Sequence, residues 1–251
     1  GAGPIVSADG RFVAFRSFGR ELVSGQVEAN EENPFTYDVF LYNRLTGVNT
    51  LVSHAPGSPL TAVGSTGPSD EYAESWMDLD LSADGRFVVF ASVSETLIGE
   101  EQEPEGSDFL LQDVFLFDRE TGAVTGVSER IATRAYEPKI SADGRFIAFT
   151  GDDFVGYFAN PIFDGNLFLY DRVTGATTQA SHPGSSSCAG SLPYFKYRYS
   201  GSPVLSAAGH VLAFTSTACD LVPLDLNGGP PEDPAFGDYL SDADVFVSIH
   251  P

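Results

Sequence analysis

Short apolar runs of two kinds alternate along the chain. Runs of the first kind mix aromatic and aliphatic residues, follow the phrase Ser-Ala-Asp-Gly, and occur at 11–15, 86–90 and 145–149, with a degenerate copy at 210–214. The Asp-Gly pair is a strong hairpin signal because both residues tolerate the positive φ of a tight turn. The runs are too short for helices and rich in strand-forming residues. Each copy therefore predicts a β-hairpin.

Runs of the second kind are almost continuously apolar, and they occur at 39–42, 114–117, 167–170 and 245–247. Such runs are typical of strands covered on both faces. After the first three, a Thr-Gly turn leads into a Thr- and Val-rich strand, whereas the fourth lacks this continuation. Each complete unit is predicted to be a four-stranded antiparallel sheet.

A sheet with apolar residues on both faces is not stable alone, but sheets placed radially around an axis cover one another. The chain is therefore predicted to be all-β: a β-propeller of four blades of four-stranded antiparallel sheets in one domain, 1–251, with the last blade incomplete. The predicted blades are 1–53, 76–128, 136–181 and 202–251. A closed four-bladed ring is favoured, and the alternatives are a fragment of a larger propeller or a ring completed by a second chain.

The fourth blade ends on its third strand, so it is predicted to have an unpaired edge. Exposed strand edges pair with other chains unless they are blocked. Three arrangements remain open: a three-stranded blade, an insertion that covers the edge, or a strand supplied by another subunit. The third arrangement predicts self-association.

The phrase S-x-D-G-R-x-[VIL]-A-F, followed by D-V-F-[LV]-x-D-R-x-T-G, resembles the TolB-like (WD-like) bacterial β-propeller repeat of periplasmic and secreted proteins. Residues 220–228 (DLVPLDLNG) are also similar to a linker that precedes DVFV in extracellular bacterial repeats. The resemblance covers all four blades and implies an extracellular or periplasmic location. It does not specify a function, because such propellers serve as scaffolds, binding modules and accessory domains.

The formal net charge of −22 changes the list of expected partners. Nucleic acids and anionic membrane surfaces are both unfavourable partners, because binding them requires clustered Lys and Arg. No apolar run approaches the ~20 residues that cross a bilayer. The expected partner is a second copy of the chain or another extracellular protein.

Acidic residues are dense in the long loops, most of all in blade 4. Calcium takes about six to eight oxygen ligands, which carboxylates and an Asn side chain supply. Calcium is therefore the expected cofactor, with solvated acidic loops as the alternative. The candidate ligands are Asp225, Asn227, Asp238, Asp242 and Asp244.

Two further features lie near the fourth hairpin. Cys188 and Cys219 are the only cysteines, and a disulfide between them fits an oxidising compartment, with two unpaired thiols as the alternative. An aromatic and basic segment at 192–199 is either an interaction surface or an irregular strand packed between blades. The candidate interaction residues are Tyr194, Tyr197, Arg198 and Tyr199, together with Trp76 in the equivalent connection before blade 2.

No catalytic constellation stands out. The chain has four histidines and no Gly-x-Ser-x-Gly elbow, and His54 and His182 occupy equivalent places after outer strands. The turn residues Asp84 and Arg86 recur in other copies, which indicates turn formation and an ion pair between blades.

The function predicted from the sequence is therefore a secreted, non-enzymatic β-propeller that acts as a structural or interaction module. It would assemble through its open blade edge and be stabilised by calcium. The alternatives are a carbohydrate- or protein-recognition module, and a propeller hydrolase or lyase with an acidic pocket on the axis.

Overall fold

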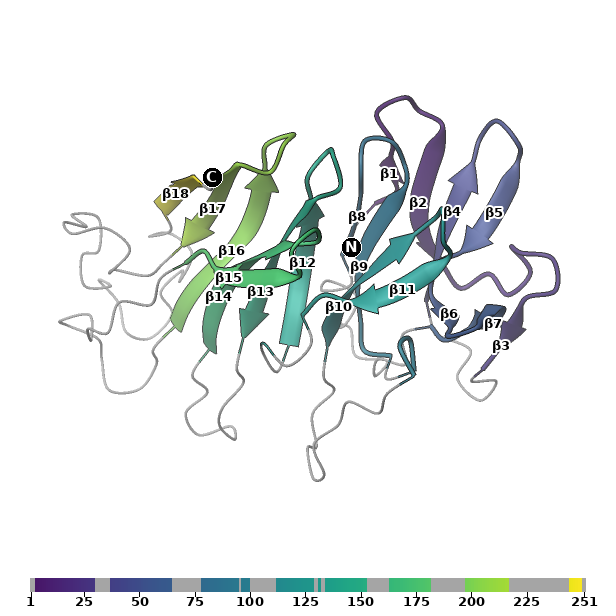
Figure 1. The fold of residues 1–251 in the computed structure, drawn as a ribbon. Coiled ribbons are helices and arrows are strands. Elements are labelled where there is room, and N and C mark those ends of the chain that lie inside the picture. Colours follow the sequence, from purple (N-terminus) through teal and green to yellow (C-terminus); the bar gives the residue numbers. More distant parts are fainter. Residues whose placement is uncertain are drawn as a thin grey trace, which may run out of the picture.

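The fold was analysed in a computed structural model that describes residues 3–29, 37–64, 78–94, 96–99, 112–128, 131, 134–152, 163–181, 197–216 and 244–249. The strands of this part form four successive blades and one small extra sheet (Figure 1). Among these residues, no helix has the length and apolar character needed to span a membrane.

The strands of each blade follow one another in space and are antiparallel. Blade 1 contains β1 (Ile5–Val6), β2 (Phe12–Ser17), β4 (Asp38–Asn43) and β5 (Val48–Leu51). Blade 2 contains β8 (Leu79–Leu81), β9 (Phe87–Ser92), β10 (Asp113–Asp118) and β11 (Ala123–Gly126). Blade 3 contains β12 (Arg134–Ile140), β13 (Phe146–Asp152), β14 (Phe163–Asp171) and β15 (Ala176–Gln179). Blade 4 contains β16 (Tyr197–Leu205), β17 (Val211–Ser216) and β18 (Asp244–Ile249).

This arrangement confirms the predicted fold class, including the incomplete last blade. Within the described residues, β18 pairs with β17 on one side and has no strand where β5, β11 and β15 lie in the other blades. The expectation of a closed four-bladed ring is wrong, because the blades follow an open arc with blade 4 at one end and blade 1 at the other (Figure 1).

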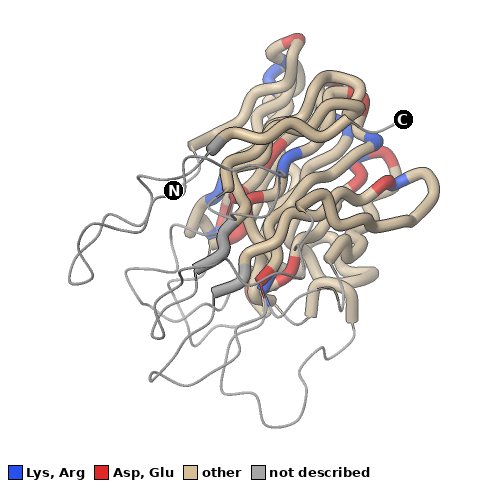
Figure 2. The backbone as a smooth tube through the Cα atoms, turned by 90° about the vertical axis from the view of Figure 1, so that its left-hand side faces the viewer, with Lys and Arg blue, Asp and Glu red and all other residues tan. Residues whose placement is uncertain are grey.

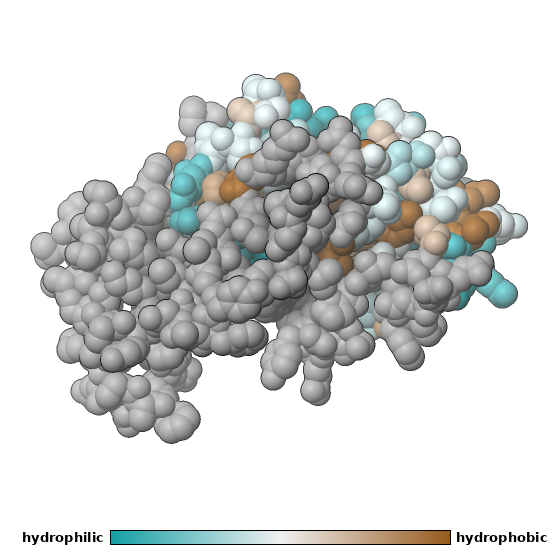
Figure 3. Space-filling view, turned by 90° about the horizontal axis from the view of Figure 1, so that it is seen from below, coloured by the Kyte–Doolittle hydropathy of each residue, from teal (hydrophilic) through white to brown (hydrophobic). Residues whose placement is uncertain are grey.

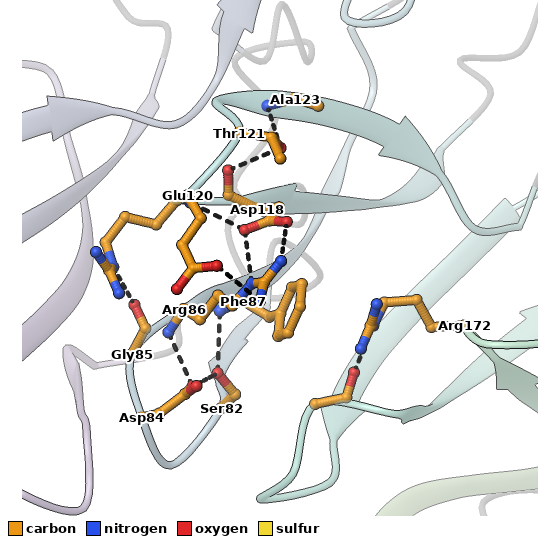
Figure 4. A network of polar contacts seen from close by, with 12 residues as sticks. Ser82, Asp84, Gly85, Arg86, Phe87, Asp118, Glu120, Thr121, Ala123 and Arg172 are labelled. Atoms are coloured by element: carbon orange, nitrogen blue, oxygen red, sulfur yellow. Dashed lines mark hydrogen bonds and ion pairs between the residues drawn. The ribbon is translucent and has the colours of Figure 1, made fainter.

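The hairpin turns form as the sequence predicts. In blade 2, Ser82 Oγ donates to Asp84 Oδ1 at 2.7 Å and accepts from Phe87 N at 2.9 Å, while Asp84 Oδ1 accepts from Arg86 N at 3.0 Å (Figure 4). Partial burial raises the pKa of Asp84, but the hydrogen bonds from Ser82 and Arg86 outweigh it and hold the pKa below its usual value. The same bonds close the turns of blades 1 and 3.

Blades 2 and 3 bury both faces against their neighbours. We call the face that packs on the following blade the trailing face, and the opposite face the leading face. Alternation along β9 places Phe87 and Val89 on the trailing face, against blade 3, and Val88 and Phe90 on the leading face, against blade 1. The core of the protein therefore consists of successive layers between blades.

A glycine in the hairpin turns of blades 2, 3 and 4 lets the preceding blade approach closely. A Cβ atom built on Gly85 would lie 2.6 Å from Phe12 Cγ of blade 1. Gly144 and Gly209 meet Phe87 and Phe146 of their preceding blades in the same way. A larger residue would therefore push the blades apart at this point.

An arginine of the following blade covers the same aromatic ring. Arg119 Nε donates to Gly85 O at 3.0 Å, and its guanidinium lies 4.5 Å from the centroid of the Phe12 ring. Arg172 of blade 3 lies 4.1 Å from the ring of Phe87. These cation–π contacts add to the apolar packing between blades.

Two features of the fold have no counterpart in the sequence-based prediction. The first residues of β14 pair in parallel with those of β16, Phe163 with Tyr197, which joins blades 3 and 4 into one sheet. A small sheet of β3 (Val27–Glu28), β7 (Ser58–Ala62) and β6 (His54–Ala55) lies beside blade 1. Both features form at the end of the blades opposite the hairpin turns (Figure 1).

Candidate functional site

The trailing face of blade 4 is bare. Val245 is 73% exposed and Val247 is 63% exposed, although their positions in the repeat belong to the buried core of the other blades. The equivalent residues are Val39 and Leu41 (5% and 1%), Val114 and Leu116 (0% and 5%), and Leu167 and Leu169 (0% and 4%). Blade 4 therefore has the core face of an internal blade, and within the described residues no following blade covers it.

The bare residues form one continuous patch. Val247 pairs with Ala213 of β17, and Val204 of β16 pairs with the other side of Ala213. Val211 pairs with Ile249 at the end of β18. Val204, Val211 and Ile249 are 64%, 38% and 78% exposed, so the apolar patch crosses all three strands. Exposed apolar patches that cross an element in this way mark interaction sites.

The opposite end of the arc has a complementary feature. On the leading face of blade 1, Val6 is 56% exposed, whereas the equivalent residues Leu81 and Ile140 are 8% and 7% exposed. Gly10 has nothing described within 4 Å of the place where a Cβ would stand, unlike Gly85. Among the described residues, no preceding blade covers this part of blade 1, as one covers the equivalent part of blades 2 to 4.

The rest of the leading face of blade 1 is covered. Phe40 packs there with Leu51 and Ala62, and the partly buried Leu22 and Val23 complete the cluster. Among the described residues, the bare part of this face is at the end that carries the hairpin turn, at Val6.

Most of the residues proposed from the sequence lie outside the described residues. These are Asp225, Asn227, Asp238, Asp242, Cys188, Cys219, Tyr194 and Trp76. Asp244 begins β18 and the segment 197–199 begins β16, but nothing is described of the side chains of Asp244, Tyr197, Arg198 and Tyr199. The calcium site and the disulfide therefore stay predictions, and in the described part no three His, Cys, Asp or Glu residues are placed to hold a metal.

The expected ion pair between blades is wrong in its location. Arg86 makes two hydrogen bonds to Asp118, of 2.9 and 2.8 Å, and both residues belong to blade 2 (Figure 4). Arg145 and Asp171 repeat this pair within blade 3. The contact between blades comes instead from Arg119 and Arg172, which the sequence did not single out. The repeated Asp-Arg dipeptide before the Thr-Gly turn was the signal for it.

A buried carboxyl group marks the first residue of β4. Asp38 is 2% exposed and accepts a 2.9 Å hydrogen bond from Ser53 Oγ. Burial raises the pKa of Asp38 to about 7, although the Ser53 bond opposes this shift. Asp113 is bonded to Ser128 in the same way, and burial raises its pKa too. Such repetition indicates a structural role for these carboxyl groups rather than a single active centre.

Acidic residues near the axis link successive blades. Asp80 Oδ2 in blade 2 accepts from Ile140 N of blade 3 at 3.0 Å. Glu137 Oε2 in blade 3 accepts from Ser202 N of blade 4 at 2.9 Å. His54 is 6% exposed and its Nε2 lies 3.1 Å from Gly122 O of blade 2. These polar groups bind backbone atoms between blades, which accounts for them without a catalytic role.

The other large exposed apolar residues of the described surface lie in loops and turns, at the start of β5 and in the small extra sheet: Phe18, Leu45, Val173, Val48, Val27 and Leu60. Basic residues lie among acidic ones along the described backbone (Figure 2). From the end opposite the hairpin turns, apolar atoms lie beside hydrophilic ones (Figure 3). The trailing face of blade 4 is therefore the candidate site.

The fold and this face define an incomplete β-propeller. No protein-family model matches the chain, and no curated protein matches its sequence. Among solved structures, the tricorn protease aligns over 97% of this chain and 17% of its own, with a TM-score of 0.54 and 14% identity. This likeness supports the fold alone.

Two other propeller structures are similar at a lower score. TolB from Acinetobacter baumannii aligns over 85% of this chain and 37% of its own, with a TM-score of 0.45 and 16% identity. The β-propeller domain of the Trilobed protease from Pyrococcus furiosus aligns over 86% of this chain and 50% of its own, with a TM-score of 0.47 and 12% identity. The chain thus spans at most half the length of these three structures.

Proposed function

We propose that the chain is a non-enzymatic structural module that assembles with a second copy of itself through blade 4. The observation that carries this proposal is the exposure of Val245 and Val247, whose equivalents in three other blades are buried core residues. A blade that ended the arc in water would need a polar outer face, as the terminal repeats of other repeat proteins have.

The outer face of blade 4 is instead more apolar than the same face of blades 2 and 3. Ile249 stands where blades 2 and 3 have Asp118 and Asp171, and Val204 stands where they have Asp80 and Lys139. At two positions where the internal blades carry charges, the terminal blade therefore carries exposed aliphatic side chains. This pattern favours an interface over a surface that faces solvent.

Two further parts of the proposal come from the sequence. The acidic loops favour calcium as a stabilising ligand, and the TolB-like phrases favour a periplasmic or extracellular setting. Neither part is needed for the assembly through blade 4.

The mass of the protein in solution tests the proposal. We expect sedimentation velocity at about 10 to 100 µM, a range suited to micromolar affinities, to give twice the 26.8 kDa of the monomer. Val247→Lys should return the monomer, because it places a charge in the patch while β18 keeps its strand pairing.

Val173→Lys is the matched control. Val173 is 67% exposed, close to the 63% of Val247, but it lies in the β14–β15 turn of blade 3. This variant should associate like the wild type. A wild-type protein that stays monomeric over the whole range would refute the proposal.

A further inference from the structure

We infer that the trailing face of blade 4 receives the leading face of blade 1 from a second copy, so that two open arcs close into one eight-bladed ring. This inference rests on the proposed function and specifies the partner surface. It follows from the interface that the protein already forms three times between its own blades.

Each internal interface joins a trailing face to the leading face of the following blade. The trailing side supplies the third-strand residues that in blade 4 are Val245 and Val247, and the leading side supplies a pair that in blade 2 is Leu81 and Val88. Within the described residues, the arc of four blades leaves one half-interface of each kind without a partner. These halves are the bare face of blade 4 and the bare part of blade 1.

The leading face of blade 1 keeps the features that such an interface uses. Val6 pairs with Val13, as Leu81 pairs with Val88 in blade 2. Gly10 holds the same φ of +68° as Gly85, and the space beside it is open, where Gly85 meets Phe12. In the ring, Val211 of the second copy occupies this space, because Val211 is the blade 4 residue that corresponds to Phe12.

Backbone hydrogen bonds between successive hairpin turns form a second series of contacts between blades, independent of the apolar faces. Ala8 N donates to Ala83 O at 2.9 Å, and Ala83 N donates to Ala142 O at 3.0 Å, so the turns of blades 1, 2 and 3 are linked in order. Asp143 N continues the series to Ala207 O of blade 4 at 3.3 Å. The carbonyl of Ala8 is the place where a turn that precedes blade 1 would donate.

A second copy can cover both the bare face of blade 4 and the bare part of blade 1. Two arcs joined from blade 4 to blade 1 at both junctions are related by a two-fold axis and leave no half-interface exposed. The resulting eight blades lie within the range of four to eight that propellers adopt. Direct pairing of two blade 4 faces would instead leave both blade 1 faces bare.

Two single variants distinguish these arrangements. Val247→Lys blocks the blade 4 half, and Val6→Lys blocks the blade 1 half. In the ring, each variant alone should sediment as a monomer where the wild type is a dimer. Gly10→Asn should weaken the dimer too, because Asn tolerates a positive φ but fills the open space. Val173→Lys serves as the control that stays dimeric.

Mixing the two variants should restore association, which tests the ring by a gain of binding. One intact interface remains between Val247→Lys and Val6→Lys chains, so a one-to-one pair should form when they are mixed. Because the ring gains from two junctions formed together, this pair should be about 100-fold weaker or more than the wild-type dimer. The mixture is therefore studied by sedimentation equilibrium with one variant fluorescently labelled, at a concentration at least about 100-fold above that at which the wild type dissociates.

The outcomes separate this inference from the proposed function. A Val6→Lys variant that stays dimeric, or a mixture that stays monomeric, overturns the ring. If Val247→Lys is monomeric in that case, self-association through blade 4 still holds. Masses that grow with concentration beyond the dimer also overturn the closed ring. A wild type that is monomeric throughout overturns both.

Discussion

Replacing Gly85 with alanine should destabilise the protein far more than the same replacement at Gly10. The two glycines occupy the same place in the hairpin turns of blades 2 and 1, and both have a φ of +68°. An alanine in the left-handed region costs about 1–2 kcal/mol at either position. This backbone cost cancels when the two variants are compared.

The remaining difference comes from Phe12. A Cβ on Gly85 would lie 2.6 Å from Phe12 Cγ, whereas one on Gly10 has nothing described within 4 Å. Phe12 is 3% exposed, and the guanidinium groups of Arg11 and Arg119 lie 5.0 and 4.5 Å from its ring centroid. The ring has little room to move, and overpacking of this kind costs about 1–3 kcal/mol. We therefore expect Gly10→Ala to lose about 1–2 kcal/mol and Gly85→Ala about 2–5 kcal/mol.

Urea unfolding followed by far-ultraviolet circular dichroism measures both losses. Both variants are made in the Val247→Lys background, so that association does not contribute to the measured free energy. In the same background, Phe12→Leu combined with Gly85→Ala should lose less than the sum of the two single changes, because the smaller side chain relieves the clash. Equal losses for Gly10→Ala and Gly85→Ala would refute the close approach of the blades at this turn.

Three further predictions concern charges. Burial raises the pKa of Asp38 to about 7 from 3.8. Between pH 4 and 7 the folded protein therefore binds one proton more than the unfolded chain, so its stability falls by up to about 4 kcal/mol as the pH rises over this range. Asp38→Asn, which copies the residue of blade 3, should flatten this fall and raise stability at pH 8 in urea unfolding, and a wild-type stability that rises over this range would contradict it. Arg134→Ala should lower the free energy of unfolding by about 3 kcal/mol, because it leaves the buried carboxylate of Asp152, which is 4% exposed, without its cation. Arg86→Ala, which breaks a partly exposed ion pair, should lower it by less than about 1 kcal/mol. Similar losses for the two variants would contradict this prediction. About 1 mM calcium, in the range of extracellular sites, should raise the melting temperature relative to a chelator, and an unchanged midpoint would count against calcium.

The blades were predictable because their signals are local. The Asp-Gly turn of blade 2 is closed by the side chains of Ser82 and Asp84 and the backbone amides of Arg86 and Phe87, and these hydrogen bonds span five residues or fewer. The alternation from Phe87 to Phe90 fixes which side chains lie on opposite faces. Neighbouring residues thus determine the strands and their two faces.

The contacts between blades were not predictable in the same way. Gly85 meets Phe12 across more than one blade of sequence, and nothing in the turn itself indicates which side chain it will meet. The same holds for Arg119, whose Asp-Arg dipeptide suggests a pair within the blade as readily as a contact to the next one. The candidate site was missed for a related reason. Val245 and Val247 have the sequence of a core strand, and only the arrangement of the described blades shows that they are exposed.

The acidic composition opposes the association of two copies, whereas the apolar patch on blade 4 favours it. A net charge of −22 on each copy opposes association at every distance within the Debye length, which is about 10 Å at 0.1 M salt. The patch on blade 4 favours association only at contact, through the burial of apolar surface. Added salt screens the first effect and leaves the second in place, so a dimer held by this patch becomes tighter as ionic strength rises. A dimer held by ion pairs would become weaker instead, because salt screens those attractions. The sign of the salt dependence therefore tells whether the bare face of blade 4, rather than the charged loops, holds the two copies together.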